Sequence, residues 1–202
     1  MTERLDQVVA DGISVWQSFQ EQIRPYGFHT FMPGHYESVR DTLTAVLATA
    51  SRKDTAPRFL ELGSATGVIT IMADIMGYRT ASGIEIDPFL VEAARALARR
   101  HGSRARFAAG SFLPAGYTWH DERGDSRLGT LGLGAAAYSS LGHTLDTFDV
   151  VYGYPWDGEA QILHDLMARY GAPEALLLLH GGAGRITVYR QAGRQADRRA
   201  DG

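Results

Sequence analysis

From Arg58 to His180 the chain alternates short apolar runs with amphipathic stretches, and this alternation constrains the fold more than any other feature. Strands alternating with helices at this pitch form βαβ units, whose right-handed crossovers place helices on both faces of a parallel sheet. The predicted strands are residues 58–62, 80–86, 105–109, 146–152 and 175–180, and the predicted helices are 67–76, 88–101 and 158–170. The predicted fold class is α/β, with a doubly wound, mostly parallel sheet.

Both ends of the chain depart from this pattern. Residues 4–23 and 36–50 carry apolar positions at helical spacing, with an aromatic segment between them. After the last parallel strand a Gly-rich turn leads to residues 186–189, which we expect to return as an antiparallel edge strand. The predicted divisions are an N-terminal helical cap (1–57), a core (58–190) and a flexible, Arg-rich tail (191–202).

A long segment rich in Gly, Ala and Ser, residues 115–145, is inserted between the third and fourth strands. Loops of this length in a compact domain are often functional, for example as active-site lids. Tyr117, Trp119 and His120 open the segment and belong either to such a lid or to a variable loop.

The composition of the chain limits the classes of partner and site that are expected. Hydrophobic residues make up 45% and charged residues 21%, a globular balance, and the net charge is -3. The 19 Arg residues are scattered, so no basic face for a phosphate backbone is evident and nucleic acid is not an expected partner. The chain has no Cys, which excludes disulfides, thiolate metal sites and a Cys nucleophile. Its seven His residues are dispersed, so we expect no metal site.

The sequence contains no continuous apolar leader and no run of 18 apolar residues, so neither a signal peptide nor a membrane span is expected. A cytoplasmic location is therefore the default expectation. In the first helix, Trp16 and Phe19 pack either on the core or on a second subunit of a homodimer.

The segment from Phe59 to Gly67 is an apolar strand followed by a glycine-bearing turn and a helix. Gly63 and Gly67 allow the backbone to approach a ligand closely, and the helix offers unpaired N–H groups at its start. Ser64 and Thr66 add hydroxyls there. A carboxylate at Glu61 would repel a pyrophosphate but suits a cation such as an amino-acid ammonium.

Two further strand ends complete a nucleoside-binding pattern. Glu85 lies 22 residues beyond Gly63, where an acidic side chain can accept hydrogen bonds from both ribose hydroxyls. Ile86 would then lie beside the base. At the third strand end, Gly110 and Ser111 can reach the adenine edge and Phe112 can cover its ring.

Over residues 58–180 the chain resembles the class I, Rossmann-like S-adenosylmethionine-dependent methyltransferases. The family's first motif, acid-x-Gly-x-Gly-x-Gly, is matched by Glu61, Gly63, Ala65 and Gly67, with Ala65 in place of the middle glycine. The family's strand-two acid is matched by Glu85, whereas its strand-three acid is replaced by Ser111. Strand four, ending near Tyr152, resembles the fourth motif. The C-terminal end is shorter than in the family.

This resemblance implies that S-adenosylmethionine is the cofactor and S-adenosylhomocysteine the product. The small size of the chain favours a small molecule methylated at N or O, and a protein or peptide acceptor remains open. The substrate is expected over strand four, where Tyr154 and Trp156 form a rigid apolar wall with polar tips. This stretch partly resembles the Asn/Asp-Pro-Pro-aromatic motif of amino-group methyltransferases, but Gly153 replaces the residue that holds the amino group.

Methyl transfer needs a base only if the acceptor carries a proton at the working pH. Our catalytic candidates are His35, Tyr154 and Glu159, and His29 and Tyr36 are candidate substrate contacts. Asp157 and His180 are further options for the base. Each also has a structural interpretation, since Asp157 can cap the following helix and Glu159 can favour its dipole.

Other interpretations remain open at this stage. The glycines could serve only strand–helix packing. A nicotinamide-dependent oxidoreductase shares the fold, but the loop lacks Gly-x-Gly-x-x-Gly and the single lysine, Lys53, precedes the core. A non-catalytic cofactor-binding subunit, or an enzyme using the sulfonium for other chemistry, is also compatible with the motifs.

Overall fold

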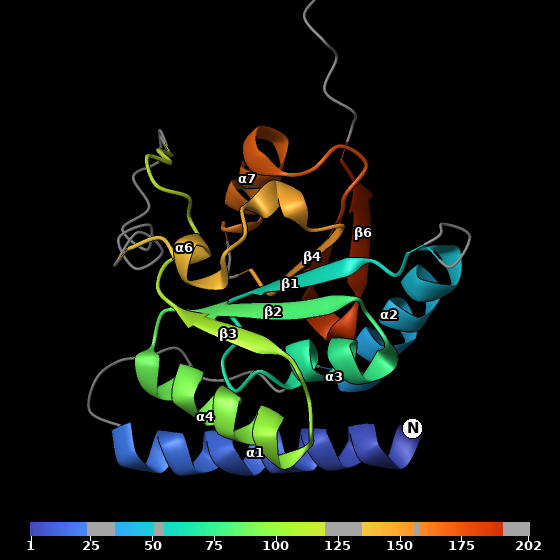
Figure 1. Cartoon of the computed structure of the whole chain (residues 1–202), viewed down its shortest axis with the longest axis vertical. Coiled ribbons are helices and arrows are strands. Elements are labelled where there is room, and N and C mark those ends of the chain that lie inside the picture. Colours follow the sequence, from blue (N-terminus) through green and yellow to red (C-terminus); the bar gives the residue numbers. More distant parts are fainter. Residues whose placement is uncertain (24–34, 51–54, 120–134, 156–157, 192–202) are drawn as a thin grey trace, which may run out of the picture.

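The computed structural model describes residues 1–23, 35–50, 55–119, 135–155 and 158–191. Six strands form one sheet in the order β3-β2-β1-β4-β5-β6, in which β1 to β5 are parallel and β6 runs antiparallel to β5 (Figure 1). The strands are β1 (Arg58–Leu62), β2 (Thr80–Glu85), β3 (Arg106–Ala109), β4 (Val150–Gly153), β5 (Leu176–His180) and β6 (Ile186–Arg190). The predicted fold class is confirmed, including the antiparallel edge strand.

Helices cover both faces of the sheet. On one face lie α2 (Tyr36–Ala50), α3 (Val68–Met76) and α4 (Pro88–Arg100), with α1 (Thr2–Ile23) packed outside α3 and α4 (Figure 1). On the other face lie the short α6 (Tyr138–Leu141), the 3-10 turn η1 (Leu145–Thr147) and α7 (Ala160–Tyr170). A second 3-10 turn, η2 (Gly182–Gly184), joins β5 to β6. None of the helices in the described ranges is both long and apolar enough to cross a membrane.

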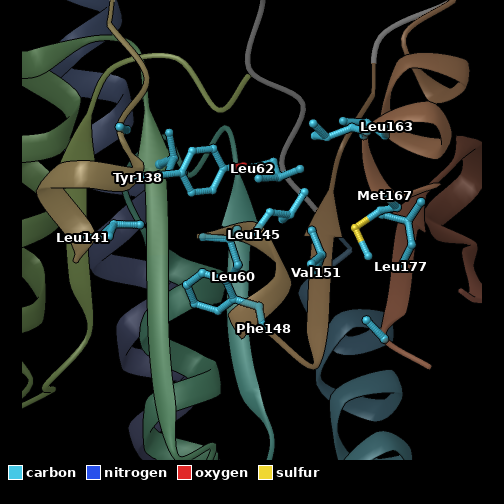
Figure 2. Close-up of a cluster of buried hydrophobic side chains, with 14 of the residues drawn as sticks. Leu60, Leu62, Tyr138, Leu141, Leu145, Phe148, Val151, Leu163, Met167 and Leu177 are labelled. Carbon is cyan, nitrogen blue, oxygen red and sulfur yellow. The ribbon is translucent and has the colours of Figure 1, made fainter. Parts of the chain in front are cut away.

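The fourth strand begins later than predicted. Residues 145–147 form η1, and β4 starts at Val150 instead of residue 146. Within the predicted strand, Phe148 is apolar and 0% exposed, and together with the preceding Leu145, which is 2% exposed, it packs against the sheet from a turn. Figure 2 shows them gathered with Leu60 of β1. Burial alone therefore gave these positions a strand-like pattern.

The second half of the long insertion belongs to the core. Tyr138 and Leu141 of α6 are buried with Leu62 of β1 (Figure 2). Backbone hydrogen bonds join Ser111 to Ala135 and Ala137 and fix this segment beside β3. The lid interpretation is therefore wrong for residues 135–145, which are held by apolar packing. Residues 120–134 lie outside the described ranges.

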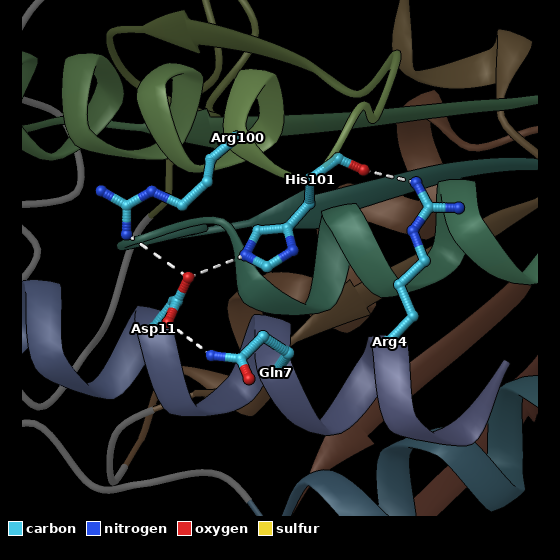
Figure 3. A network of polar contacts seen from close by, with 5 residues as sticks. All are labelled: Arg4, Gln7, Asp11, Arg100 and His101. Atoms are coloured by element: carbon cyan, nitrogen blue, oxygen red, sulfur yellow. Dashed lines mark hydrogen bonds and ion pairs between the residues drawn. The ribbon is translucent and has the colours of Figure 1, made fainter.

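The N-terminal helix is tied to the end of α4 by a polar network (Figure 3). The Asp11 carboxylate accepts hydrogen bonds from Gln7 (2.9 Å) and Arg100 (3.3 Å) and lies 3.1 Å from Nε2 of His101. Arg4 donates to the carbonyl oxygen of His101. The bonds from Gln7, Arg100 and His101 hold the pKa of Asp11 below its usual value. Charge thus anchors α1 at the edge of the sheet opposite the strand ends described next.

Candidate cofactor and acceptor site

The parallel strands end at one edge of the sheet, which is where ligands bind in open α/β folds. In the loop after β1, Gly63 has a φ of 75° and is exposed, and a Cβ built there would meet nothing within 4 Å. Gly67 has a similar φ of 78°, but a Cβ there would come within 2.6 Å of the Phe107 ring and 2.9 Å of Ala94. The two motif glycines therefore do different things: Gly63 leaves open space over the backbone, and Gly67 permits tight helix packing.

Glu85, at the end of β2, braces this loop. Its Oε2 accepts a hydrogen bond from the Ala65 N–H (2.8 Å), and its Oε1 accepts one from the Asp87 N–H (3.0 Å). The carboxylate is 8% exposed, and burial raises its pKa. Each oxygen keeps a further lone pair, so the geometry allows Glu85 to hold the loop and accept ribose hydroxyls together.

Glu61, at the end of β1, lies deeper. It is 4% exposed, and its Oε2 accepts from both the N–H (2.9 Å) and the hydroxyl (2.5 Å) of Thr70 in α3. Burial raises the pKa of Glu61 to about 8, and the neighbouring Glu85 charge contributes to the rise. In the described part of the chain, no salt bridge involves either carboxyl. Two buried acids side by side favour a cationic ligand group.

The predicted hydroxyl contacts are placed differently from the glycines. Ser64 and Thr66 are 3% and 2% exposed, so their side chains lie inside the loop. The Ser64 hydroxyl has no hydrogen-bond partner within the described residues and packs against Gly83 of β2. Neither hydroxyl is therefore exposed at the edge of the sheet.

On the β2–β3 side, Ile86 directly follows β2 and is 37% exposed. Gly110 has a φ of 136° and donates its N–H to the Glu85 carbonyl oxygen. The Ser111 hydroxyl is 3% exposed and accepts from the Leu113 N–H, while Phe112 packs against the core. Ser111 is thus engaged in its own turn, and the adenine contacts predicted for these residues stay predictions.

The ends of β4 and β5 carry a cluster of aromatic and imidazole side chains on the α2 face of the sheet. The Tyr152 hydroxyl lies 2.7 Å from Nδ1 of His180, and both residues are 2% exposed. The Tyr154 ring meets the His180 ring edge-on, with 4.6 Å between centroids. His35, which directly precedes α2, stacks over His180 at 6.2 Å. Burial and the neighbouring His35 lower the pKa of His180.

The structure therefore brings together His35 and Tyr154, two of the three candidate catalytic residues, and places Tyr152 beside them. Tyr36 follows His35 and lies close enough to Glu61 for that charge to raise its pKa, after the larger effect of burial. Glu159 lies at the start of α7 with no capping hydrogen bond from its side chain. His29, Trp156 and the optional base Asp157 lie outside the described residues.

Sequence reasoning understated two positions. His180 was only an optional base, yet the structure places it at the centre of the cluster. Gly184 was not singled out, although it contacts His35 directly: a Cβ there would lie 2.4 Å from ring atom Cγ. The available signal was the Gly-rich turn that follows His180 at the end of the last parallel strand. Among the described residues, no group of three His, Cys, Asp or Glu side chains could hold a metal ion.

Comparisons with known proteins agree with this geometry. No protein-family model matches the chain. Over 85 residues it is 38% identical to ribosomal protein L11 methyltransferase from Thermus thermophilus; the match covers 42% of this chain, which spans about a third (32%) of that relative.

Among solved structures, an RNA methyltransferase from Salinibacter ruber in complex with S-adenosyl-L-homocysteine is similar with a TM-score of 0.53. That match has 20% sequence identity and covers 87% of this chain and 100% of the other. The likeness is one of fold. The resemblance stated from the sequence is thereby confirmed, and the chain has the fold of the class I S-adenosylmethionine-dependent methyltransferases.

Proposed function

We propose that this protein is an S-adenosylmethionine-dependent methyltransferase that transfers a methyl group to N or O of a small molecule. The observation that carries the proposal is the pair of buried carboxyls, Glu61 and Glu85, beside the open backbone of Gly63. S-adenosylmethionine combines the features this site accommodates: a ribose diol, and cationic sulfonium and ammonium groups.

The cofactor would supply an already activated methyl group, so the protein mainly has to align the acceptor and exclude water. Gly63 would allow close approach of the amino-acid part, and Glu85 would accept the ribose hydroxyls. Ile86 would lie against the adenine. A bound cation would favour the ionised form of Glu61, and the two carboxylates would then favour the cationic ligand over a neutral analogue.

A small acceptor is supported by the aromatic cluster at the ends of β4 and β5, where Tyr154 and His35 lie against the buried His180. A macromolecular acceptor is the second candidate. It is favoured by the local identity to a methyltransferase named for a ribosomal protein. The scattered arginines support the first candidate, because no basic tract for a nucleic acid is evident.

Two weaker alternatives share the fold. A non-catalytic cofactor-binding subunit is favoured by Ala65 and Ser111, which replace family residues in the site. An enzyme that uses the sulfonium for another reaction would retain the same cofactor contacts. The non-catalytic subunit would show no methyl transfer. The other enzyme would convert the cofactor to a product other than S-adenosylhomocysteine.

The cofactor is tested by calorimetric titration with S-adenosylmethionine, S-adenosylhomocysteine and, as a control ligand, NAD. We expect the two adenosyl ligands to bind and Glu85→Ala to weaken them about 10- to 100-fold, the range for losing charge-assisted hydrogen bonds. The matched control is Glu92→Gln on α4, whose carboxylate pairs with Arg95 at the surface. Binding of NAD alone would overturn the proposal.

The acceptor class is tested with a methyl-labelled cofactor and fractionated cell extract. Label that appears in small metabolites, measured by mass spectrometry and absent with Glu85→Ala, supports the proposed acceptor. Label in ribosomal protein or RNA fractions would transfer the assignment to the macromolecular candidate. Cofactor binding without label in any fraction would favour the non-catalytic subunit.

A further inference from the structure

The turn after β5 packs directly against the His35 side chain. Gly184 has a φ of 72° and is buried, and a Cβ built on it would lie 2.4 to 2.7 Å from three atoms of the His35 side chain. Any larger residue at position 184 would therefore displace the imidazole. Gly182, in the same turn, has open space where a Cβ would be, so tight contact is specific to Gly184.

A second imidazole lies behind the first. The rings of His35 and His180 face each other with 6.2 Å between centroids and 26° between planes. His180 is 2% exposed and is held by the Tyr152 hydroxyl, whereas His35 is exposed to solvent. The pair thus has an inner, fixed member and an outer member that an entering molecule can reach.

The surroundings of the inner ring, His180, disfavour a proton there. On the inner side, His180 faces Tyr152 and Tyr154 of the β4 end, and behind Tyr152 lie Tyr36 and Glu61. In the turn, Arg185 is exposed. Two imidazoles at this distance resist carrying charge together, and burial disfavours charge on His180. His180 is therefore the unfavourable site for a proton within the pair.

We propose that His35 is the proton acceptor of methyl transfer and that His180, fixed by Tyr152, is its positioning residue. The inference rests on the proposed function and names its substrate class: an acceptor whose nucleophilic O or N carries a proton at neutral pH, such as a phenol or an ammonium. As the bond from that atom to the methyl carbon forms, the carbon–sulfur bond breaks and its electron pair remains on sulfur. The acceptor's proton passes to a ring nitrogen of His35. With a phenol it passes as the new bond forms, and with an ammonium it passes before the attack, because the ammonium nitrogen has no free electron pair until the proton leaves.

The cofactor pair itself is the probe, because S-adenosylmethionine and S-adenosylhomocysteine differ by one positive charge at sulfur. The experiment is an NMR titration of the histidine rings in the wild-type protein saturated with each ligand, assigned with His35→Gln and His180→Gln. If His35 faces the transferable methyl, its pKa is lower with S-adenosylmethionine by on the order of one pH unit. His143 and His164, which lie outside the cluster, serve as internal references in the same spectra.

Variants distinguish the effect of the contact between Gly184 and His35 from an effect on the overall fold. We expect Gly184→Ala to displace His35 and abolish the difference between the two ligands, while Gly182→Ala retains it. His35→Gln should raise the pKa of His180 towards its ordinary value, because a neighbouring charge is removed. Thermal unfolding of each variant checks that the fold is retained.

The outcomes separate a failure of the proposed function from a failure of the role proposed for His35. If calorimetry detects no S-adenosylmethionine binding, the proposed function fails and this inference fails with it. If the cofactor binds but His35 has the same pKa with both ligands, His35 does not face the methyl group and only this inference is overturned. A lower pKa with S-adenosylmethionine that Gly184→Ala removes supports it.

Discussion

The two halves of the strand-end edge are built by different means. The half at β1, β2 and β3 is made largely of backbone, with Gly63 open to solvent and Glu85 bracing the loop through N–H groups. The half at β4 and β5 is made of side chains, where His180 contacts both Tyr152 and His35. The first half depends on local conformation, whereas the second depends on segments that meet only in the folded protein.

The largest expected effect tests the tight packing under the backbone-built half. Gly67→Ala combines a left-handed φ with a contact of 2.5 Å to the Phe107 ring, so we expect a loss of about 4 kcal/mol in the free energy of unfolding. Gly77→Ala is the matched control, since Gly77 also has a positive φ but a Cβ there meets nothing within 4 Å. Urea unfolding measures both. Equal losses would contradict the packing role of Gly67.

The second prediction concerns Glu61, the buried acid at the end of β1. Because the folded pKa of Glu61 is raised to about 8 from an ordinary 4.5, the native state binds its proton more tightly than the unfolded state. This contribution to stability is complete below pH 4.5 and is lost as the pH rises towards 8. Relative to wild type, Glu61→Gln should gain stability across that window, by on the order of 3 kcal/mol.

The readout is denaturant unfolding of the ligand-free protein at several pH values. Glu92→Gln, which removes an exposed carboxylate, should keep the wild-type pH dependence. A parallel pH dependence for wild type and Glu61→Gln would show that Glu61 is ionised in the folded protein at neutral pH.

A third prediction sharpens the side-chain half. Tyr152→Phe leaves Nδ1 of the buried His180 without its hydroxyl partner, at a cost of about 1 to 2 kcal/mol in unfolding free energy. Tyr78→Phe is a matched loss, because the Tyr78 hydroxyl donates to the Leu43 carbonyl oxygen away from the cluster. Both should lower stability, but only Tyr152→Phe should alter the NMR titration of His180. An unchanged His180 titration would mean that the tyrosine does not fix the ring.

The smallest effect returns to the loop. Ala65 has a φ of 44°, a conformation that costs an L-residue energy and that glycine adopts freely. Ala65→Gly should raise the free energy of unfolding by about 0.5 to 1 kcal/mol, since relief of strain is partly offset by the entropy of the unfolded chain. Thermal unfolding measures the change, with Ala115→Gly on the exposed surface as the control. Destabilisation by Ala65→Gly would show that its methyl group makes a useful contact.

For two segments, residues 146–152 and 115–145, composition gave an incomplete account of the local structure, and the reasons are physical. The strand expected to begin at residue 146 was inferred from apolar residues, but burial in a turn gives Leu145 and Phe148 the same composition as a strand. For residues 115–145 the content of small residues left a lid and a variable loop both open, yet Tyr138 and Leu141 hold the second half of the segment in the core. Composition reports burial, and it does not report which element produces it.

The sequence by itself determined the succession of strands and helices along the chain and the turn of the backbone-built half of the site. These follow from apolar periodicity and from turns of a few residues, such as Gly63 to Gly67 before α3, in which each signal lies next to the structure it specifies. Only the tertiary structure decided that His35, Tyr152, His180 and Gly184 form one cluster. The contacts of His35 with His180 and Gly184 cross about 145 to 150 positions of the chain, and such pairings are fixed by the packing of the whole sheet and α2 rather than by any local pattern.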